Sequence, residues 1–345
     1  MSLLGNGSLF HVVKIGGRLS PLETCLMYSL PFFMCASEFR AWLLWNAACQ
    51  LALFVPVVQL PAFITGHMAY VDIGWPIGLV LLALNCMVFG NGFHRRRLLV
   101  GGCMLLHGAR MAMGALFMFY PYKWKEDLPR YAYAKLRFLT QDGMSPNLWP
   151  LKMQHDTLQQ AFANSFVLAA PLVLCAFNES PALSTLEIIG SVLWALSWAW
   201  ESIADMQKLA FLAECKRAKQ RYTVLGLAPF SGRKYWLWTL CRHPNYFGEW
   251  MAWNAFVVMA LPSFMSLNES AIVKGAFALS LFYTSRMFYD CLNYWTGAEP
   301  AEYFSVQKRE RYREYQRQTR MFFPFELPFV DHCRKAGWPR LEVSS

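Results

Sequence analysis

Residues 41–64 read AWLLWNAACQLALFVPVVQLPAFI, a run without a charged side chain. A helix needs about 20 mostly apolar residues to cross the hydrocarbon core of a bilayer, so this run is long enough to span a membrane. Further long apolar stretches are 70–92, 98–120, 157–177, 183–204, 246–266 and 271–295. Together they predict an all-α, polytopic transmembrane helix bundle of about seven spans. The shorter stretch 22–36 is an eighth segment or lies in the membrane interface.

The composition of the 345 residues also indicates a membrane protein. Hydrophobic residues make up 56% and charged residues 16%, whereas about a quarter of a soluble domain is charged. Soluble globules, disordered chains, collagen and coiled coils are therefore excluded. The net charge of +10 indicates contact with lipid headgroups or a site for an anionic ligand. Nucleic acid is not expected as a partner, because the basic residues do not form a separate soluble domain.

The ten cysteines are predicted to be reduced and structural. The sequence contains no CxxC, and no histidine lies at zinc-finger spacing from a cysteine pair. Most of the cysteines lie in apolar runs, where Cys behaves as a small hydrophobe. We therefore expect no metal site.

Basic side chains gather in three polar segments: 121–156, 207–244 and 296–345. The connectors 178–182 and 267–270 contain neither Lys nor Arg. The positive-inside rule then predicts a small basic cap on the cytosolic side. One stretch conflicts with this topology, because His94-Arg95-Arg96-Arg97 falls on the opposite side if 98–120 crosses the membrane fully. Either 98–120 is re-entrant or the number of spans differs by one.

The most specific stretch is 236–253, WLWTLCRHPNYFGEWMAW. Pro244 suits the first position of a helix, which would begin at the cytosolic membrane surface. Its free N–H groups, with Arg242 beside them, would attract a phosphate or carboxylate. Glu249 lies just over one turn deeper, where an ionisable group is a functional candidate. The alternative is an ordinary interfacial cap with a snorkelling arginine.

Further polar residues lie within or at the ends of the apolar stretches. Glu201 and Asp205 are four residues apart and share one helix face. They could bind ribose or amide groups, pair with basic residues, or form a solvated helix end. Asp72, together with His107 and Arg110, is expected to be buried in the membrane. These residues form either a network that holds helices together or part of a site.

The segment 296–325 begins TGAEPAEYFSVQKRERYREYQRQT. It is predicted to carry one cationic stripe on a single helix, formed by Arg309, Arg313, Arg317 and Arg320, with Tyr312 and Tyr315 on neighbouring faces. Such a helix could bind lipid headgroups. It could instead be a lid that clamps polyphosphate with arginine and stacks a base on tyrosine.

In their order and spacing, these motifs resemble the steroid 5-alpha-reductase superfamily, over roughly residues 70–325. The similarity is to its branch of reductase-like membrane proteins, which is related in fold to isoprenylcysteine carboxyl methyltransferases. It rests on CRHPNYFGEW, on the upstream Glu201, Asp205 and Gln207, and on TGAEPAE, YREYQRQT and FFPF in the tail. Earlier residues that match are Asp72, Trp75, Arg110, Glu126, Asp127, Arg130 and Tyr131.

The resemblance implies an NADPH-dependent oxidoreductase acting on CH–CH groups, with the cofactor on the cytosolic side. Hydride would pass to the beta carbon of a lipophilic enone or an isoprenoid- or sterol-like lipid. Asp72 and Tyr131 are the catalytic candidates for polarising the substrate carbonyl. The implied cofactor-binding residues are Glu201, Asp205, Gln207, Arg242, His243, Asn245, Tyr246, Glu249, Tyr312, Tyr315 and Arg320. The chain departs from the pattern at His107, where Trp is expected, and in a longer 121–156 linker.

Three segments are expected: N-terminal membrane segments over 1–66, a reductase-like membrane domain over 67–325 with its cofactor half at 183–325, and a tail over 326–345. Expected partners are membrane lipids, a lipophilic small-molecule substrate and a membrane-complex partner. The endoplasmic reticulum is the default location, with a mitochondrial or bacterial inner membrane as alternatives. Two other functions stay open, namely an S-adenosylmethionine-dependent membrane methyltransferase and a non-catalytic lipid-binding or assembly subunit. The Asn-Tyr-Phe-Gly-Glu continuation after the proline and the tail favour the reductase.

Overall fold

A computed structural model describes residues 19, 21–37, 39–122, 127–140, 142–219 and 223–326. These residues form helices and no β-strand, which confirms the predicted all-α class. The α-helices are α1 (Pro21–Met34), α2 (Arg40–Phe54), α3 (Leu60–Thr65), α4 (Val71–Val88), α5 (His94–Tyr122), α6 (Pro129–Thr140), α7 (Trp149–Phe162), α8 (Ala170–Phe177), α9 (Thr185–Arg217), α10 (Trp236–Leu240), α11 (Pro244–Met265), α12 (Ala271–Asp290), α13 (Ala298–Lys308) and α14 (Tyr312–Gln318).

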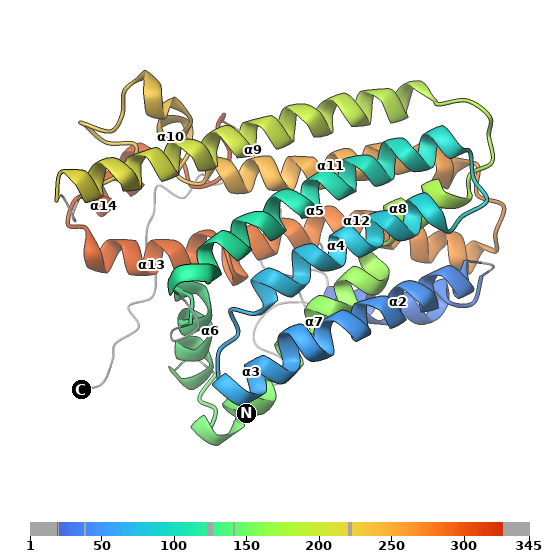
Figure 1. Ribbon diagram of the computed structural model, residues 1–345, viewed down its shortest axis with the longest axis horizontal. Helices are drawn as coiled ribbons and strands as arrows, with labels where there is room; N and C mark the ends of the chain where they lie inside the picture. Colours follow the sequence, from blue (N-terminus) through green and yellow to red (C-terminus); the bar gives the residue numbers. More distant parts are fainter. Residues whose placement is uncertain are drawn as a thin grey trace.

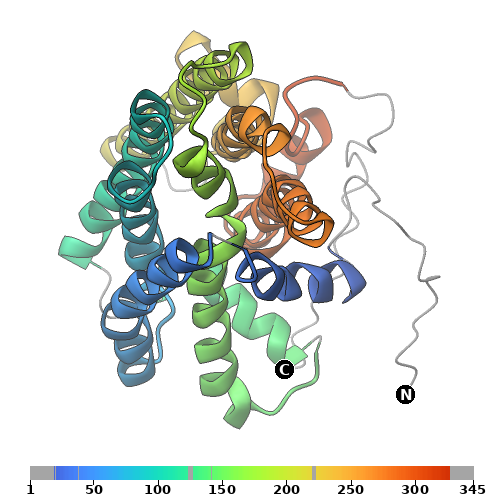
Figure 2. The same ribbon diagram turned by 90° about the vertical axis from the view of Figure 1, so that its right-hand side faces the viewer.

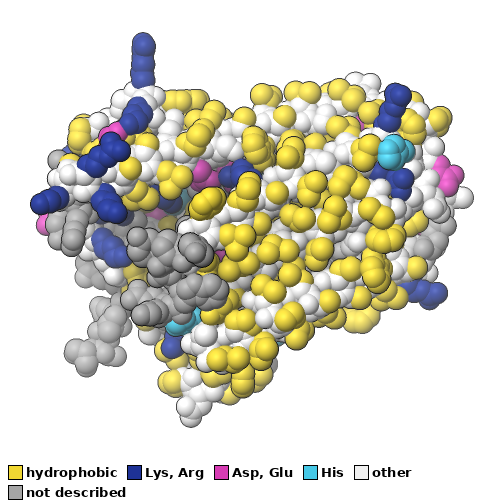
Figure 3. All heavy atoms as spheres, viewed as in Figure 1, with side chains coloured by type: hydrophobic (Ala, Val, Ile, Leu, Met, Phe, Trp, Pro, Cys, Tyr) yellow, Lys and Arg dark blue, Asp and Glu magenta, His cyan; other side chains and the backbone are white. Residues whose placement is uncertain are grey.

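The long helices lie side by side along the long axis of the molecule (Figure 1). Short helices α6, α10, α13 and α14 gather at one end, which we call the cap. A belt of apolar side chains covers the visible face between the cap and the opposite end, and Lys and Arg lie at the two ends (Figure 3). This distribution is that of a protein embedded in a bilayer.

Four helical stretches in the described part of the chain are long and apolar enough to cross a membrane: Arg40–Thr65, Val71–Val88, His94–Phe117 and Pro146–Phe177. Helices α9, α11 and α12 are also long, with 33, 22 and 20 residues. Length and apolarity identify these four stretches as candidate spans, and α9, α11 and α12 are each also long enough to cross the hydrocarbon core.

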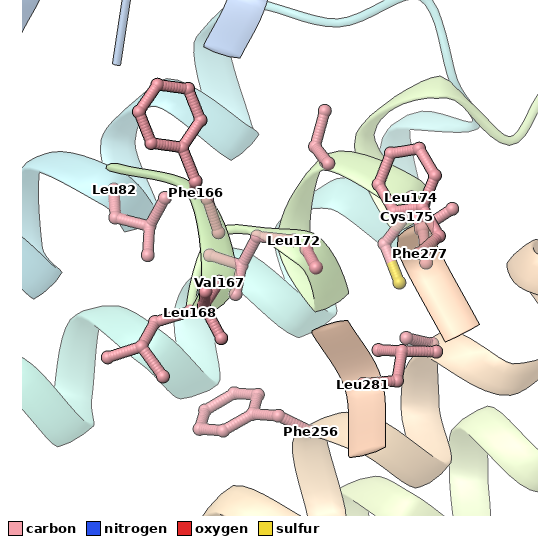
Figure 4. Close-up of a cluster of buried hydrophobic side chains, with 14 of the residues drawn as sticks. Leu82, Phe166, Val167, Leu168, Leu172, Leu174, Cys175, Phe256, Phe277 and Leu281 are labelled. Atoms are coloured by element: carbon pink, nitrogen blue, oxygen red, sulfur yellow. The ribbon is translucent and has the colours of Figure 1, made fainter. Parts of the chain in front are cut away.

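The 146–177 segment runs through the middle of the bundle, with the other helices around it (Figure 2). Its side chains Phe166, Val167 and Leu172 form the centre of the core (Figure 4). Leu82 of α4 and Phe256 of α11 belong to the same buried cluster. The core is therefore assembled from helices far apart in the sequence.

A π-helical turn, Ala163–Val167, interrupts this central segment and is held by buried amides. The Asn46 side-chain amide donates to the carbonyls of Asn164 and Ser165, at 3.1 Å each. Gln50 donates to the carbonyl of Gly78 at 2.9 Å. In hydrocarbon every backbone polar group needs an internal partner, and amide side chains of neighbouring helices supply it here.

Helix α5 is one continuous helix of 29 residues beside α4, so a re-entrant 98–120 segment is wrong. The first turn of α5 contains Arg96, one of the basic residues at the end of the bundle opposite the cap, and this residue has a structural partner. Arg96 is 1% exposed and forms an ion pair with Glu187 of α9. It also donates to the carbonyl of Asn178 at 2.7 Å. Arg96 thus ties two connections of the bundle together, and Glu187 balances its charge.

Helices α9 and α11 pack closely because two glycines face the partner helix. A Cβ on Gly190 would lie 2.9 Å from the backbone nitrogen of Met259. A Cβ on Gly248 would lie 2.8 Å from the Cβ of Glu201 and 3.0 Å from its backbone nitrogen. The α9–α11 spacing therefore depends on the absence of side chains at these positions.

We expect Gly248→Ala to destabilise the protein by about 1–3 kcal/mol, the typical cost of overpacking a tight core. The matched control is Gly275→Ala in α12, where an added Cβ meets nothing within 4 Å. This control should be neutral or slightly stabilising, because Ala favours the helix by about 0.5–1 kcal/mol over Gly. Thermal unfolding in detergent checks both variants, and equal midpoints for the two would contradict the packing argument.

Candidate functional site

A cluster of ionisable side chains lies where α5, α9 and α11 meet, in two layers one helix turn apart. The layer nearer the cap contains Arg110, Asp205 and Asn245. Arg110 Nη1 lies 3.0 Å from Asp205 Oδ2, and Asn245 Nδ2 donates to Asp205 Oδ1 at 3.1 Å. Each helix contributes one residue, so the layer links all three.

The deeper layer contains His107, Glu201 and Glu249. His107 Nε2 lies 3.1 Å from Glu249 Oε1, which also accepts a hydrogen bond from Trp253 Nε1 at 2.9 Å. Glu201 forms an ion pair with Arg110, which therefore connects the two layers. Glu201 and Glu249 are each 6% exposed and His107 is fully buried.

A second cluster docks α6 against the start of α4. The Tyr131 hydroxyl donates to Asp72 Oδ1 at 2.7 Å, and Arg130 Nη2 lies 3.0 Å from Asp72 Oδ2. Burial and the charge of Asp72 raise the pKa of Tyr131 well above its usual value. The phenol is therefore protonated at neutral pH and can act as a hydrogen-bond donor. The structure thus brings together the two catalytic candidates.

Asp127, from the same sequence motif, fixes the start of α4 by accepting from the backbone N–H groups of Met68 and Ala69, both at 2.9 Å. Glu126, the motif's other acid, lies outside the described residues.

The two clusters are connected through aromatic rings. Trp75 lies three residues after Asp72 in α4, and its ring centroid is 6.4 Å from that of Trp253. Trp253 in turn donates to Glu249. The acid–phenol pair and the ionisable cluster are therefore neighbours across α4 and α11.

Arg242 lies in a buried network that joins the start of α11 to the cap. Its Nε donates to Glu302 Oε1 at 2.7 Å and its Nη1 to the carbonyl of Gln316 at 3.0 Å. Nη2 donates to Glu302 Oε2 at 3.2 Å, and the side chain is 2% exposed. All three guanidinium nitrogens of Arg242 therefore bind groups of α13 and α14. Arg242 clamps these helices to the start of α11, and its guanidinium is not available to bind a phosphate.

His243 belongs to the same network, with Nε2 2.9 Å from Glu302 Oε1. Burial lowers the pKa of His243, although Glu302 opposes this effect. Burial alone would raise the pKa of Glu302, but hydrogen bonding to His243 and the charge of Arg242 outweigh it and lower the value to about 2. Tyr246 stacks on His243 with ring centroids 5.2 Å apart.

The cationic stripe expected on a single helix is wrong. Helix α13 ends at Lys308 and α14 begins at Tyr312, so Arg309 falls between two helices and Arg320 beyond the second. Arg313 and Arg317 are exposed on α14. Arg320 Nη2 pairs with Glu326 at 2.8 Å, and its carbonyl accepts from the Arg242 backbone at 2.8 Å. Because of the break between α13 and α14, the arginines do not share one face: Arg313 and Arg317 lie on the surface of α14, and Arg320 contacts the start of α11 through its carbonyl.

Tyr312 and Tyr315 are buried and pack on each other with ring centroids 5.7 Å apart. The Tyr315 hydroxyl donates to the carbonyl of Trp238, and a Cβ on Gly226 would lie 2.5 Å from the Tyr315 ring. Burial raises the pKa of both phenols well above the usual value. In this arrangement the two rings anchor α14 to the cap rather than offer a free face for stacking.

Among the remaining site candidates, Gln207 is buried in α9, and its Oε1 lacks a hydrogen-bond partner. Sequence reasoning missed Glu302, Gln316 and Trp253 as functional positions. The signal for Glu302 was present in AEPAE, where two acids stand in an otherwise apolar stretch. Their partners could not be read from spacing, because Arg242 and Glu302 are 60 residues apart.

A comparison with protein families matches residues 60–319 to a family described as "Protein of unknown function (DUF1295)". No curated protein and no solved structure matches the chain.

The Arg242–Glu302 network predicts acid sensitivity of the cap. Glu302 has an ordinary pKa of 4.5 and a folded value of about 2, so its ionised form stabilises the fold above pH 4.5. That stabilisation is lost as pH falls from 4.5 through 2. Glu302→Gln should abolish this component and cost about 3–5 kcal/mol at neutral pH, because Arg242 is left buried and unpaired. Thermal midpoints in detergent against pH measure both effects.

The control is Glu326→Gln, which removes the exposed partner of Arg320. A surface pair contributes about 0–1 kcal/mol, so its pH profile should follow the wild type. A Glu302→Gln variant as stable as Glu326→Gln at neutral pH would contradict the clamp.

Proposed function

The chain belongs to the DUF1295 family, and we propose that it is a membrane-embedded, NADPH-dependent reductase of a lipophilic enone or an isoprenoid- or sterol-like lipid. The observation that carries this proposal is the Tyr131–Asp72 pair, at 2.7 Å, placed beside the ionisable cluster of α5, α9 and α11. The relation of the family to steroid 5-alpha-reductase-like proteins supports it.

The residues at the cap side of the bundle suit a dinucleotide. The side-chain oxygens of Asn245 and Gln207 are buried without a hydrogen-bond partner, so each can accept from a carboxamide or a ribose hydroxyl. Asp205 lies beside Asn245 and can accept a second hydroxyl. Exposed Lys208, Arg313 and Arg317 offer positive charge for phosphates at the cap.

In this proposal, a group of buried residues positions the cofactor side of the site without touching the cofactor. These are Arg242, His243, Tyr312 and Tyr315. They hold α13 and α14 against the start of α11, the turn that carries Asn245 and Tyr246. Arg320 contributes its carbonyl to the same junction. These residues therefore maintain the cofactor side of the site without needing to touch the cofactor.

For the chemistry, NADPH would supply a hydride, which carries the two electrons of the reduction. The Tyr131 hydroxyl, which donates its single proton to Asp72 in the structure, would turn that proton to a substrate carbonyl on binding, and Asp72 with Arg130 holds the hydroxyl in place until then. Reduction of the C=C bond then requires one hydride at the beta carbon and one proton at the alpha carbon. The apolar belt of the bundle suits a substrate that partitions into the bilayer.

One observation favours the methyltransferase alternative. Three carboxyl groups, those of Glu201, Asp205 and Glu249, share the cluster with one guanidinium, which pairs with Glu201 and Asp205, and an acidic cluster also suits a sulfonium. The buried clamp at Arg242 is equally compatible with a non-catalytic subunit. Cofactor binding separates the three functions.

NADPH should bind saturably to the protein in lipid nanodiscs, measured by energy transfer from tryptophan to the nicotinamide. Asn245→Ala should weaken binding about fivefold, since a hydrogen bond contributes about 1 kcal/mol. Asn254→Ala on the same helix is the matched control, because its amide donates to the carbonyl of Trp250, and its affinity should be unchanged. Binding of S-adenosylmethionine alone would replace the reductase with a methyltransferase, and binding of neither would favour a lipid-binding subunit.

With a panel of lipophilic enones, Tyr131→Phe should lower turnover about 100-fold or more, the usual cost of removing a hydrogen-bond donor to the reacting carbonyl oxygen. NADPH affinity should stay unchanged, because Tyr131 lies outside the proposed cofactor contacts. Tyr133→Phe is the control, since Tyr133 donates to Glu299 rather than to Asp72. Equal turnover by the two variants would remove Tyr131 from the chemistry.

A further inference from the structure

The deeper layer of the cluster has the residues of a metal site. His107, Glu201 and Glu249 each offer a ligand atom, and these atoms all lie within 4.8 Å of one another. Zinc binds nitrogen and oxygen ligands at about 2.0–2.2 Å, so ligand atoms around one ion stand at most about 4.4 Å apart. A small closure of the side chains would therefore bring all three onto one ion. We propose that His107, Glu201 and Glu249 bind a first-row divalent metal ion.

Unpartnered atoms support this assignment. Glu201 Oε2, Glu249 Oε2 and His107 Nδ1 are buried, and none has a hydrogen-bond partner. Buried polar atoms without a partner are rare and costly in folded proteins. Both carboxylates therefore keep one free oxygen inside the bundle, and a metal ion would satisfy them.

The charge of the cluster points the same way. Glu201, Asp205 and Glu249 bring three carboxyl groups together, and Arg110 is the one guanidinium that pairs with two of them. His107 adds a positive charge only when protonated. Uncompensated charge is expensive inside a membrane bundle, and a divalent cation would balance the excess.

The surrounding contacts hold the three ligands in place. Trp253 donates to Glu249 Oε1, and Arg110 holds the other oxygen of Glu201. Such contacts orient metal ligands and tune their affinity. Gly248 lets the backbone of α11 approach Glu201 closely enough for ligands from α9 and α11 to meet.

The ligand set indicates the class of metal. One imidazole and two carboxylates, without a thiolate, suit Zn²⁺, Mn²⁺ or Fe²⁺. Three protein ligands leave a position for water or substrate, as in catalytic sites. The proposed cofactor contacts at Asp205 and Asn245 lie one turn nearer the cap, so the metal site does not depend on the reductase proposal.

The test uses Zn²⁺ on the full-length protein in nanodiscs, with affinity tags removed and metal stripped by a chelator. After titration and desalting, elemental analysis should find one Zn²⁺ per chain in the wild type. The double variant Glu201→Gln, Glu249→Gln should lose the ion, and His107→Ala should weaken binding at least tenfold. His155→Ala, which removes an exposed histidine on α7, should leave stoichiometry and affinity unchanged.

A second measurement guards against misfolded variants. Co²⁺ bound to wild-type protein should give the visible absorption of a nitrogen and oxygen site. A thiolate charge-transfer band would place the ion on cysteine and overturn the proposal. So would a wild type that retains no more Zn²⁺ than the double variant. Neither result requires NADPH, so failure of the metal site and failure of the reductase remain distinguishable.

Discussion

The close packing of α9 against α11 is the contact on which the rest of the site depends. Gly190 and Gly248 allow the two backbones to approach until Glu201 and Glu249 share one small space. Acids so close in a low-dielectric bundle repel each other unless cations stand beside them. Arg110 of α5 occupies that position, and His107 of the same helix contacts Glu249, so the location of α5 follows from the same constraint.

In the cap, helices α13 and α14 must be held in place at the end of the bundle. Short helices of 11 and 7 residues are unstable alone in water. The buried Arg242–Glu302 pair, with backbone carbonyls around the same guanidinium, supplies directional contacts that apolar packing lacks. Breaking such a pair is costly because the remaining charge stays buried. The cap and the start of α11 therefore act as one unit.

Several features could be predicted from residue patterns. The apolar runs located the long helices, because hydrocarbon demands internally satisfied backbone over about 20 residues. Pro244 begins α11 as expected, since proline lacks only an N–H that has no partner in a first turn. The four-residue spacing of Glu201 and Asp205 placed both on the face that meets Arg110. The tail was misjudged because its arginine spacing hid the helix break between Lys308 and Tyr312.

By itself the sequence determined the helical class, the polar end of the bundle and the residue types available for chemistry, because these follow from periodicity, hydropathy and local backbone preferences. Tertiary structure decided the partners. Arg242 meets Glu302, Tyr131 meets Asp72, and His107 meets Glu249 across 60, 59 and 142 residues. A side chain's charge can be read from sequence, but its role depends on which opposite charge shares its space. That choice follows from how the helices pack, and it cannot be read from local sequence patterns.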